Sequence, residues 1–323
     1  MDPQAVPFIK EIEKLLIRTS RNNRCLIPGC SSQPIGSHVI ARKTLELIAD
    51  SSKVFTWDTK PSAWKIARTI DAFQPLEDPT RVGIDDDHKV KYPLFCSTHD
   101  GPVFAPLEVE EFTCTPEQVF LLAYRGACYK TYHGPMLEAF FEVARRHGYQ
   151  PSLDTPERRE KLARFRAADI LLDVRKRYEQ IRETKDYQQL GWSIYPVNMQ
   201  PCVAATNTFL FVYGSDADAI VNGAQTITAE DFISFSLLPY KPLNNSICII
   251  SWFRGSQRAR RFMHLSGVNE LTEKQQQDMF RSLAFESSIV YISPTWWESL
   301  SREQRTEYKK LYHEAGRKHA HLV

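Results

Sequence analysis

Cys25-Leu-Ile-Pro-Gly-Cys30 and Phe95-Cys96-Ser-Thr-His99-Asp100 are the two stretches of this chain that decide its fold. The proline and glycine between the first two cysteines favour a tight turn, which directs both thiols to one side. The two-residue spacing of the second cysteine and the histidine lets one helical turn or knuckle direct both side chains at a single ion. Three thiolates and an imidazole suit Zn²⁺ better than a hard cation such as Mg²⁺. The expected ligands of one structural Zn²⁺ ion are therefore Cys25, Cys30, Cys96 and His99.

A long insertion separates the two expected ligand pairs. Its entropic cost is small, because loop closure costs only about 0.6 kcal/mol for each doubling of length. A structural zinc site contributes on the order of 10 kcal/mol at neutral pH, so the metal can hold the two ends together. The alternative is that these cysteines are ordinary buried apolar side chains. That second interpretation is the one we prefer for the other four cysteines, Cys114, Cys128, Cys202 and Cys248.

The composition is that of an ordinary globular protein. The chain has 323 residues, of which 42% are hydrophobic and 25% are charged, so it is long enough for more than one core. Its formal net charge of +2 gives no overall signature of nucleic-acid binding. Any basic binding surface must therefore be local.

The cysteine pattern and the apolar runs predict a cytoplasmic protein. Seven cysteines show no regular disulfide framework, which favours a reducing compartment. Residues 7–12 read as the start of an amphipathic helix, not as a secretory signal. No apolar run reaches the roughly 18 residues of a membrane span, so we expect no membrane partner.

The first predicted segment, residues 1–114, combines the two ligand pairs with short helices. The spacing of apolar residues predicts helices at 8–19 and 43–49. Scattered prolines predict an irregular chain at 50–90, where Asp85-Asp86-Asp87 is typical of a solvated loop. We expect this segment to be a zinc-binding module with a long insertion.

The second predicted segment, residues 115–190, is entirely helical. Thr115-Pro116 is typical of a helix N-cap followed by proline at the first helical position. Gly134-Pro135 predicts a break between two helices. Apolar residues at three- and four-residue steps then predict a long helix from about 155 to 186.

The third predicted segment, residues 191–323, mixes strands and helices. Runs of β-branched and aromatic residues between turns predict strands at 192–197, 202–212, 232–238, 246–253 and 289–292. Helical patterns predict helices at 272–286 and 301–316. We expect an antiparallel sheet backed by helices, which makes the chain as a whole an α+β protein.

The order of the N-terminal features resembles the treble-clef zinc finger of HNH endonucleases. In both, a zinc turn is followed by a strand carrying a histidine and then by a helix that starts at a second ligand pair. The resemblance implies that His38 is the general base of phosphodiester hydrolysis. It implies that Asp100 helps to hold a catalytic Mg²⁺ or Mn²⁺ ion. Ser37 and Phe104 stand at two positions where the HNH family carries metal-binding side chains.

The same residues are also similar to a group of uncharacterised bacterial proteins. The shared elements are Ser37-His38-Val39-Ile40, then the Phe95–Asp100 motif, then a helix carrying Ala123-Tyr124-Arg125. This likeness implies a bacterial protein but no particular activity. A buried Arg125 needs a carboxylate partner, for which Glu108 and Asp100 are the candidates.

A basic stretch near the C-terminus is a candidate nucleic-acid contact. It contains no acidic residue, and arginines beside a glycine turn can bind phosphate with two hydrogen bonds. The alternative is a solvated loop or an interdomain salt-bridge patch. The candidate residues are Arg254, Arg258, Arg260 and Arg261.

These features favour a nucleic-acid-associated function. The leading hypotheses are a degenerate HNH-like nuclease and zinc-dependent binding of DNA or RNA. A role in defence against phages or mobile elements follows only by analogy with other HNH-like proteins. The alternative is a non-catalytic zinc-finger scaffold whose C-terminal segment binds a protein partner. Whether His38 is a base, a further zinc ligand or a side chain that bonds the backbone stays open.

Overall fold

A computed structural model describes most of the chain, with several gaps. The described residues are Glu11, Lys14, 24–57, 77–87, 89–146, 170–212, 218–220 and 222–319. Within these, the side chains of residues 133–145 and 313–319 are not described. The helix predicted at 8–19, apart from Glu11 and Lys14, and the first half of the helix predicted at 155–186 lie outside the described residues.

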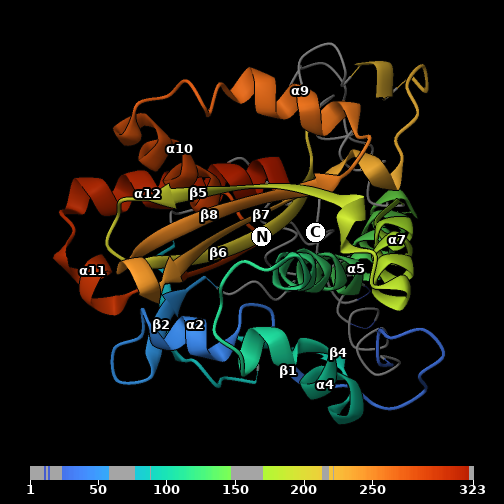
Figure 1. Cartoon of the computed structure of the whole chain (residues 1–323), viewed down its shortest axis with the longest axis horizontal. Coiled ribbons are helices and arrows are strands. Elements are labelled where there is room, and N and C mark those ends of the chain that lie inside the picture. The colour runs from blue at the N-terminus through green and yellow to red at the C-terminus, as the bar shows by residue number, and fades with distance from the viewer. Residues whose placement is uncertain are drawn as a thin grey trace.

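A seven-stranded antiparallel sheet forms the centre of the fold (Figure 1). Its strand order is β3-β2-β9-β6-β7-β8-β5, and every neighbouring pair runs antiparallel. The strands are β2 (Lys53–Thr56), β3 (Thr80–Gly83), β5 (Leu190–Val197), β6 (Val203–Leu210), β7 (Phe232–Tyr240), β8 (Asn245–Phe253) and β9 (Ile289–Ile292). The antiparallel sheet and the α+β class predicted from sequence are thus confirmed.

The prediction of an irregular chain from 50 to 90 is wrong in part. Strands β2 and β3 lie in this stretch and pair along their whole length. Phe55 of β2 also pairs with Ile292 of β9, which comes from the far end of the chain. Each strand has only four residues, and its single inward valine, Val54 or Val82, is too short a pattern to recognise. One sheet therefore joins strands from the first and third predicted segments.

Helices cover both faces of the sheet (Figure 1). On one face lie α5 (Pro116–Arg146) and α7 (Leu171–Thr184), which share a core with the N-terminal elements. On the other face lie α9 (Gln257–Ser266), α10 (Glu273–Phe285), α11 (Pro294–Ser299) and α12 (Arg302–His319). No helix among the described residues has both the length and the apolarity to cross a membrane.

Small hydroxyl side chains line the middle of the sheet where α5 crosses it. The Oγ1 atom of Thr208 lies 3.3 Å from the Oγ atom of Ser234, which also lies 3.2 Å from the hydroxyl of Tyr178 on α7. A Cβ atom added to Gly126 of α5 would lie 3.3 Å from Thr208 Oγ1 and 3.5 Å from Thr206 Oγ1. Glycine on the helix and small residues on the sheet therefore allow this close contact.

Two local interpretations differ from the structure. Helix α5 continues through Gly134-Pro135, because a proline removes one backbone hydrogen bond and the rest of the helix remains. Helix α9 occupies the basic stretch, for which a solvated loop was one of the alternatives. Its N-cap is Ser256, whose side chain accepts a hydrogen bond from Ala259 N at 3.1 Å, and its C-cap is Gly267 in the left-handed conformation.

A small two-stranded sheet lies beside the large one and carries the candidate site. Strand β1 (Ile35–His38) pairs antiparallel with β4 (Lys91–Phe95). The short helix α2 (Arg42–Glu46) follows β1, and α4 (Ser97–Glu108) follows β4. Helix α4 runs past Pro102, because the buried Phe104 and Leu107 anchor its second half.

Candidate metal centre

The turn between the first two cysteines is built by the residues that the sequence indicates. Gly29 has a φ of +75°, a left-handed conformation that favours glycine. The turn is closed by a hydrogen bond from Cys30 N to Ile27 O at 3.1 Å. A second bond, from Leu26 N to Leu94 O at 2.9 Å, ties the turn to β4. The turn is therefore fixed next to the strand that leads to the second ligand pair.

The second ligand pair lies at the start of α4. Cys96 is the N-cap residue, and its carbonyl accepts hydrogen bonds from His99 N and Asp100 N, both at 2.9 Å. One helical turn thus places the thiol and the imidazole on the same side, as predicted.

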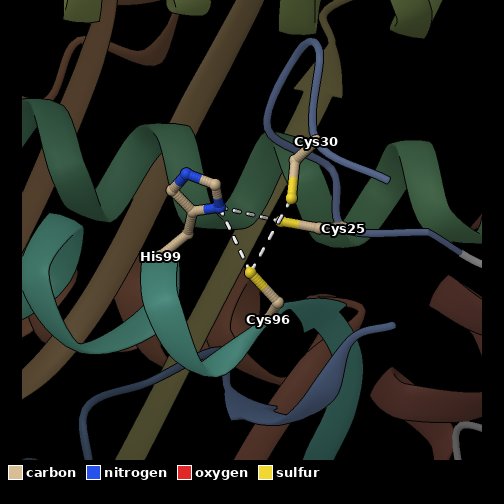
Figure 2. A group of neighbouring side chains, drawn as sticks. All are labelled: Cys25, Cys30, Cys96 and His99. Carbon is tan, nitrogen blue, oxygen red and sulfur yellow. Dashed lines mark hydrogen bonds between the residues drawn. The ribbon is translucent and has the colours of Figure 1, made fainter. Parts of the chain in front are cut away.

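The four predicted ligands converge on one point (Figure 2). Their ligand atoms all lie within 4.8 Å of one another. The Sγ atoms of Cys30 and Cys96 are 3.8 Å apart, and His99 Nδ1 lies 3.2 Å from Cys96 Sγ and 3.5 Å from Cys25 Sγ. A tetrahedral site with Zn–S bonds of about 2.3 Å has S···S edges of about 3.8 Å. The group can therefore hold a metal ion with little rearrangement.

The environments of the thiols differ. Burial raises the pKa of Cys25 to about 11, whereas hydrogen bonds from the backbone and hydroxyl of Ser32 lower the pKa of Cys30 to about 7. Cys25 and Cys96 are buried, and Cys30 is partly exposed. At neutral pH Cys30 ionises readily on its own, while Cys25 ionises when a cation supplies the compensating charge.

His38 lies at the end of β1 and bonds the backbone. Its Nε2 atom lies 2.8 Å from Ile84 O and 3.8 Å from Asp85 Oδ1. Because a carbonyl oxygen only accepts hydrogen bonds, Nε2 must carry the proton. Burial lowers the pKa of His38, which leaves the ring neutral with Nδ1 as its proton-accepting nitrogen. His38 is not part of the converging metal group.

Arg125 of α5 is buried against α4 with the carboxylate partners that the sequence predicted. The residue is 1% exposed. Its Nη1 atom lies 2.6 Å from Glu108 Oε1, and its Nη2 atom lies 3.6 Å from Asp100 Oδ1. The guanidinium carbon stacks 4.1 Å from the ring centroid of Phe104, a favourable cation–π contact. The phenylalanine that stands at an expected metal-ligand position thus supports the arginine instead.

Asp100 joins this network next to the metal group. Burial raises its pKa, and the positive charge of Arg125 opposes that effect. Its carboxylate also faces the hydroxyl of Ser37 and feels the charges of Glu108 and His38. The structure therefore brings the two predicted catalytic residues, His38 and Asp100, into one partly buried polar cluster.

The carboxylates of Asp85, Asp86 and Asp87 bind nearby basic side chains or backbone N–H groups of the same region. Asp85 accepts a hydrogen bond from Arg42 Nε at 3.0 Å. Asp86 Oδ1 accepts one from Lys89 N at 3.0 Å. Asp87 pairs with Lys91 at 2.7 Å. These carboxylates shape the loop that presents the carbonyl of residue 84 to His38.

Three of the four candidate phosphate-binding arginines are exposed, and one is buried. Arg258 is buried, with its Nη1 atom 3.3 Å from Phe211 O and its Nε atom 3.6 Å from Asp231 Oδ1. We therefore leave Arg258 out of any binding surface. The exposed members are Arg254, Arg260 and Arg261.

Lys130 of α5 is an unusual residue that the sequence interpretation missed. It is 2% exposed, and burial lowers its pKa to about 7. Its burial could have been inferred from sequence, because Lys130 follows Gly126 by four residues and so lies on the same face of the helix. That face packs on the sheet.

Comparison of the chain with protein-family models, with curated proteins and with solved structures gave no match. The chemistry of the site therefore rests on its own residues. Those residues provide four donor atoms that can hold a borderline-soft cation such as Zn²⁺. Next to them, the buried Arg125 pairs with the partly exposed Asp100 and Glu108.

Proposed function

We propose that this chain is a zinc-stabilised, nucleic-acid-associated protein whose metal centre is structural. The observation that carries the proposal is the convergence of Cys25, Cys30, Cys96 and His99 at the junction of β1, β4 and α4 (Figure 2). The metal would connect the N-terminal turn to the start of α4 and so fix the small sheet in place.

The donor set favours zinc, and it favours a structural role. Three sulfurs and one imidazole nitrogen form a common structural zinc site. Catalytic zinc sites keep one position open for water or substrate, whereas all four positions here are supplied by the protein. The partly exposed Cys30 gives the ion an entry path.

The nucleic-acid part of the proposal is supported by the arrangement of the elements. The metal turn, a strand ending in His38, its partner β4 and the helix α4 follow one another in the order that resembles a treble-clef, HNH-like unit. The insertion between β1 and β4 contributes β2 and β3 to the large sheet instead of lying apart.

Hydrolysis is the second candidate function, and one observation favours it. His38 lies close enough to Asp100 for a positive charge on its ring to lower the pKa of that carboxyl group. One contact weighs against it, because Asp100, the expected ligand of a catalytic metal ion, pairs with Arg125. Nucleic-acid binding without hydrolysis therefore agrees better with the geometry.

Two assays on the zinc-loaded protein test the proposal. We expect binding of labelled duplex DNA or single-stranded RNA at low salt, and no cleavage of plasmid or RNA with Mg²⁺ or Mn²⁺. Cleavage that disappears in His38→Ala and persists in the exposed control Lys274→Ala would establish the nuclease. Absence of binding to any nucleic acid would refute the association and favour the scaffold alternative, in which the C-terminal segment binds a protein.

A further inference from the structure

The outer face of α9 carries a row of arginine and other polar side chains, which we call the α9 surface. Its exposed members are Arg254, Gln257, Arg260, Arg261 and His264. They follow helical steps of three and four residues, so they lie along one side of the helix and its first turn. No acidic residue occurs between positions 254 and 268.

Two arginines of this surface, Arg254 and Arg260, are held in position by neutral acceptors. Arg254 donates to Leu190 O at 3.1 Å and to Gln188 Oε1 at 3.3 Å. Arg260 donates from Nη2 to Gly255 O at 3.2 Å. Carbonyl acceptors orient a guanidinium without neutralising its charge, and each guanidinium has five N–H donors. Both side chains therefore keep charge and donors for a further partner.

The composition of the α9 surface indicates the chemistry of that partner. Its strong cations are all arginine, the side chain that binds phosphate with two parallel hydrogen bonds. Leu265 is the one exposed large apolar residue of α9, at 45% exposure. A protein interface usually has an apolar or aromatic centre, which this surface lacks. A polymer with repeated phosphates fits such a row better than an acidic protein does.

The α9 surface is well separated from the metal centre. Figure 1 shows α9 at the top of the view and β1 and α4 at the bottom, with the sheet between them. The buried residues of α9 belong to the core on one face of the sheet, and the metal ligands belong to the core on the other face. Substitutions on α9 should therefore leave the metal site intact.

We propose that the α9 surface contacts the phosphate backbone of nucleic acid. This inference rests on the proposed nucleic-acid association and names the surface responsible for it. The contact carries no sequence information, since phosphate contacts set position and affinity while base contacts set specificity. Its affinity depends on salt, because each neutralised phosphate releases counterions.

The test compares two double variants with matched changes of charge. Arg254→Glu/Arg260→Glu alters the α9 surface, and Lys53→Glu/Arg302→Glu makes the same charge change at exposed positions elsewhere. Binding to a labelled DNA duplex of about two helical turns is measured between roughly 50 and 200 mM salt. For two lost phosphate contacts, the slope of log K against log salt falls by about 2, and affinity at low salt falls by more than about tenfold. Circular dichroism and zinc content verify that both variants are folded.

The outcomes of this experiment distinguish failure of the proposed phosphate contact from failure of the proposed function. Loss of slope in the α9 variant alone supports the inference. Equal slopes in wild type and the α9 variant would overturn it while leaving the proposed function intact. Failure of the wild type to bind any duplex or single strand would overturn both. Competition by polyglutamate as effective as competition by unlabelled DNA would also overturn it, in favour of an acidic protein partner.

Discussion

Replacing the buried Lys130 with methionine should make the protein more stable at neutral pH. The residue is 2% exposed, and desolvation of its amine by burial is the cause of its shifted pKa. Burial therefore disfavours its charged form and lowers its pKa from 10.5 to about 7. Methionine keeps the length and flexibility of the side chain without the amine.

The size and sign of the effect follow from linkage. Between pH 7 and 10.5 the unfolded chain binds the proton and the folded chain does not, so stability rises with pH in this window. A difference of 3.5 pKa values corresponds to about 5 kcal/mol at full protonation of the folded state. Burial of the amine therefore lowers the free energy of unfolding by about 4 kcal/mol at pH 7 and by about 2 kcal/mol at pH 9. These values are upper limits, because the protein can relax around the amine.

Urea denaturation of wild type and Lys130→Met at pH 7 and pH 9 measures this effect. The variant should gain up to about 4 kcal/mol at pH 7, and its advantage should shrink by about 2 kcal/mol at pH 9. Lys274→Met on α10, where the lysine is exposed, is the matched control and should change stability by less than about 0.5 kcal/mol. An advantage of Lys130→Met that does not vary with pH would refute the reasoning, and so would a loss of stability at pH 7.

Three further outcomes are expected. Gly126→Leu should cost about 1–3 kcal/mol of unfolding free energy, because its side chain meets Thr208, whereas Gly83→Leu, where an added Cβ meets nothing within 4 Å, should cost less. Glu108→Gln should cost about 1–3 kcal/mol, because it removes one of the two carboxylate charges that pair with the buried Arg125; a cost below about 0.5 kcal/mol in urea denaturation would contradict this. Chelation should lower the melting temperature, and added Zn²⁺ should restore it; a melting curve insensitive to both would contradict a structural metal.

Predictions from the sequence were most accurate where a few neighbouring residues determine the local structure. The turn at Gly29 and the one-turn spacing of Cys96 and His99 were predicted from a few neighbouring residues, and the structure has both. The strand at 289–292 was predicted with its correct bounds, because four consecutive apolar and β-favouring residues are bounded by serines. Short-range patterns of this kind depend little on the rest of the fold.

The features that sequence interpretation missed depend on distant partners. Strand β2 becomes recognisable only through its pairing with β3 and with Ile292 of β9. Lys130 would be interpreted as exposed on most helices, and its burial follows from the close packing of α5 on the sheet. Arg125 lies between these cases, because its burial implied a carboxylate and the structure supplied both candidates. Side-chain chemistry limits the possible partners, but only the fold determines which of them meet.

The zinc content of the purified, folded protein tests the central claim most directly. Metal analysis by mass spectrometry should give about one zinc ion per chain in the wild type, and much less in Cys96→Ser, which removes one of the four donors. A wild-type protein that is folded and cooperative in thermal unfolding, yet contains no zinc and takes up none when it is added, would contradict the account.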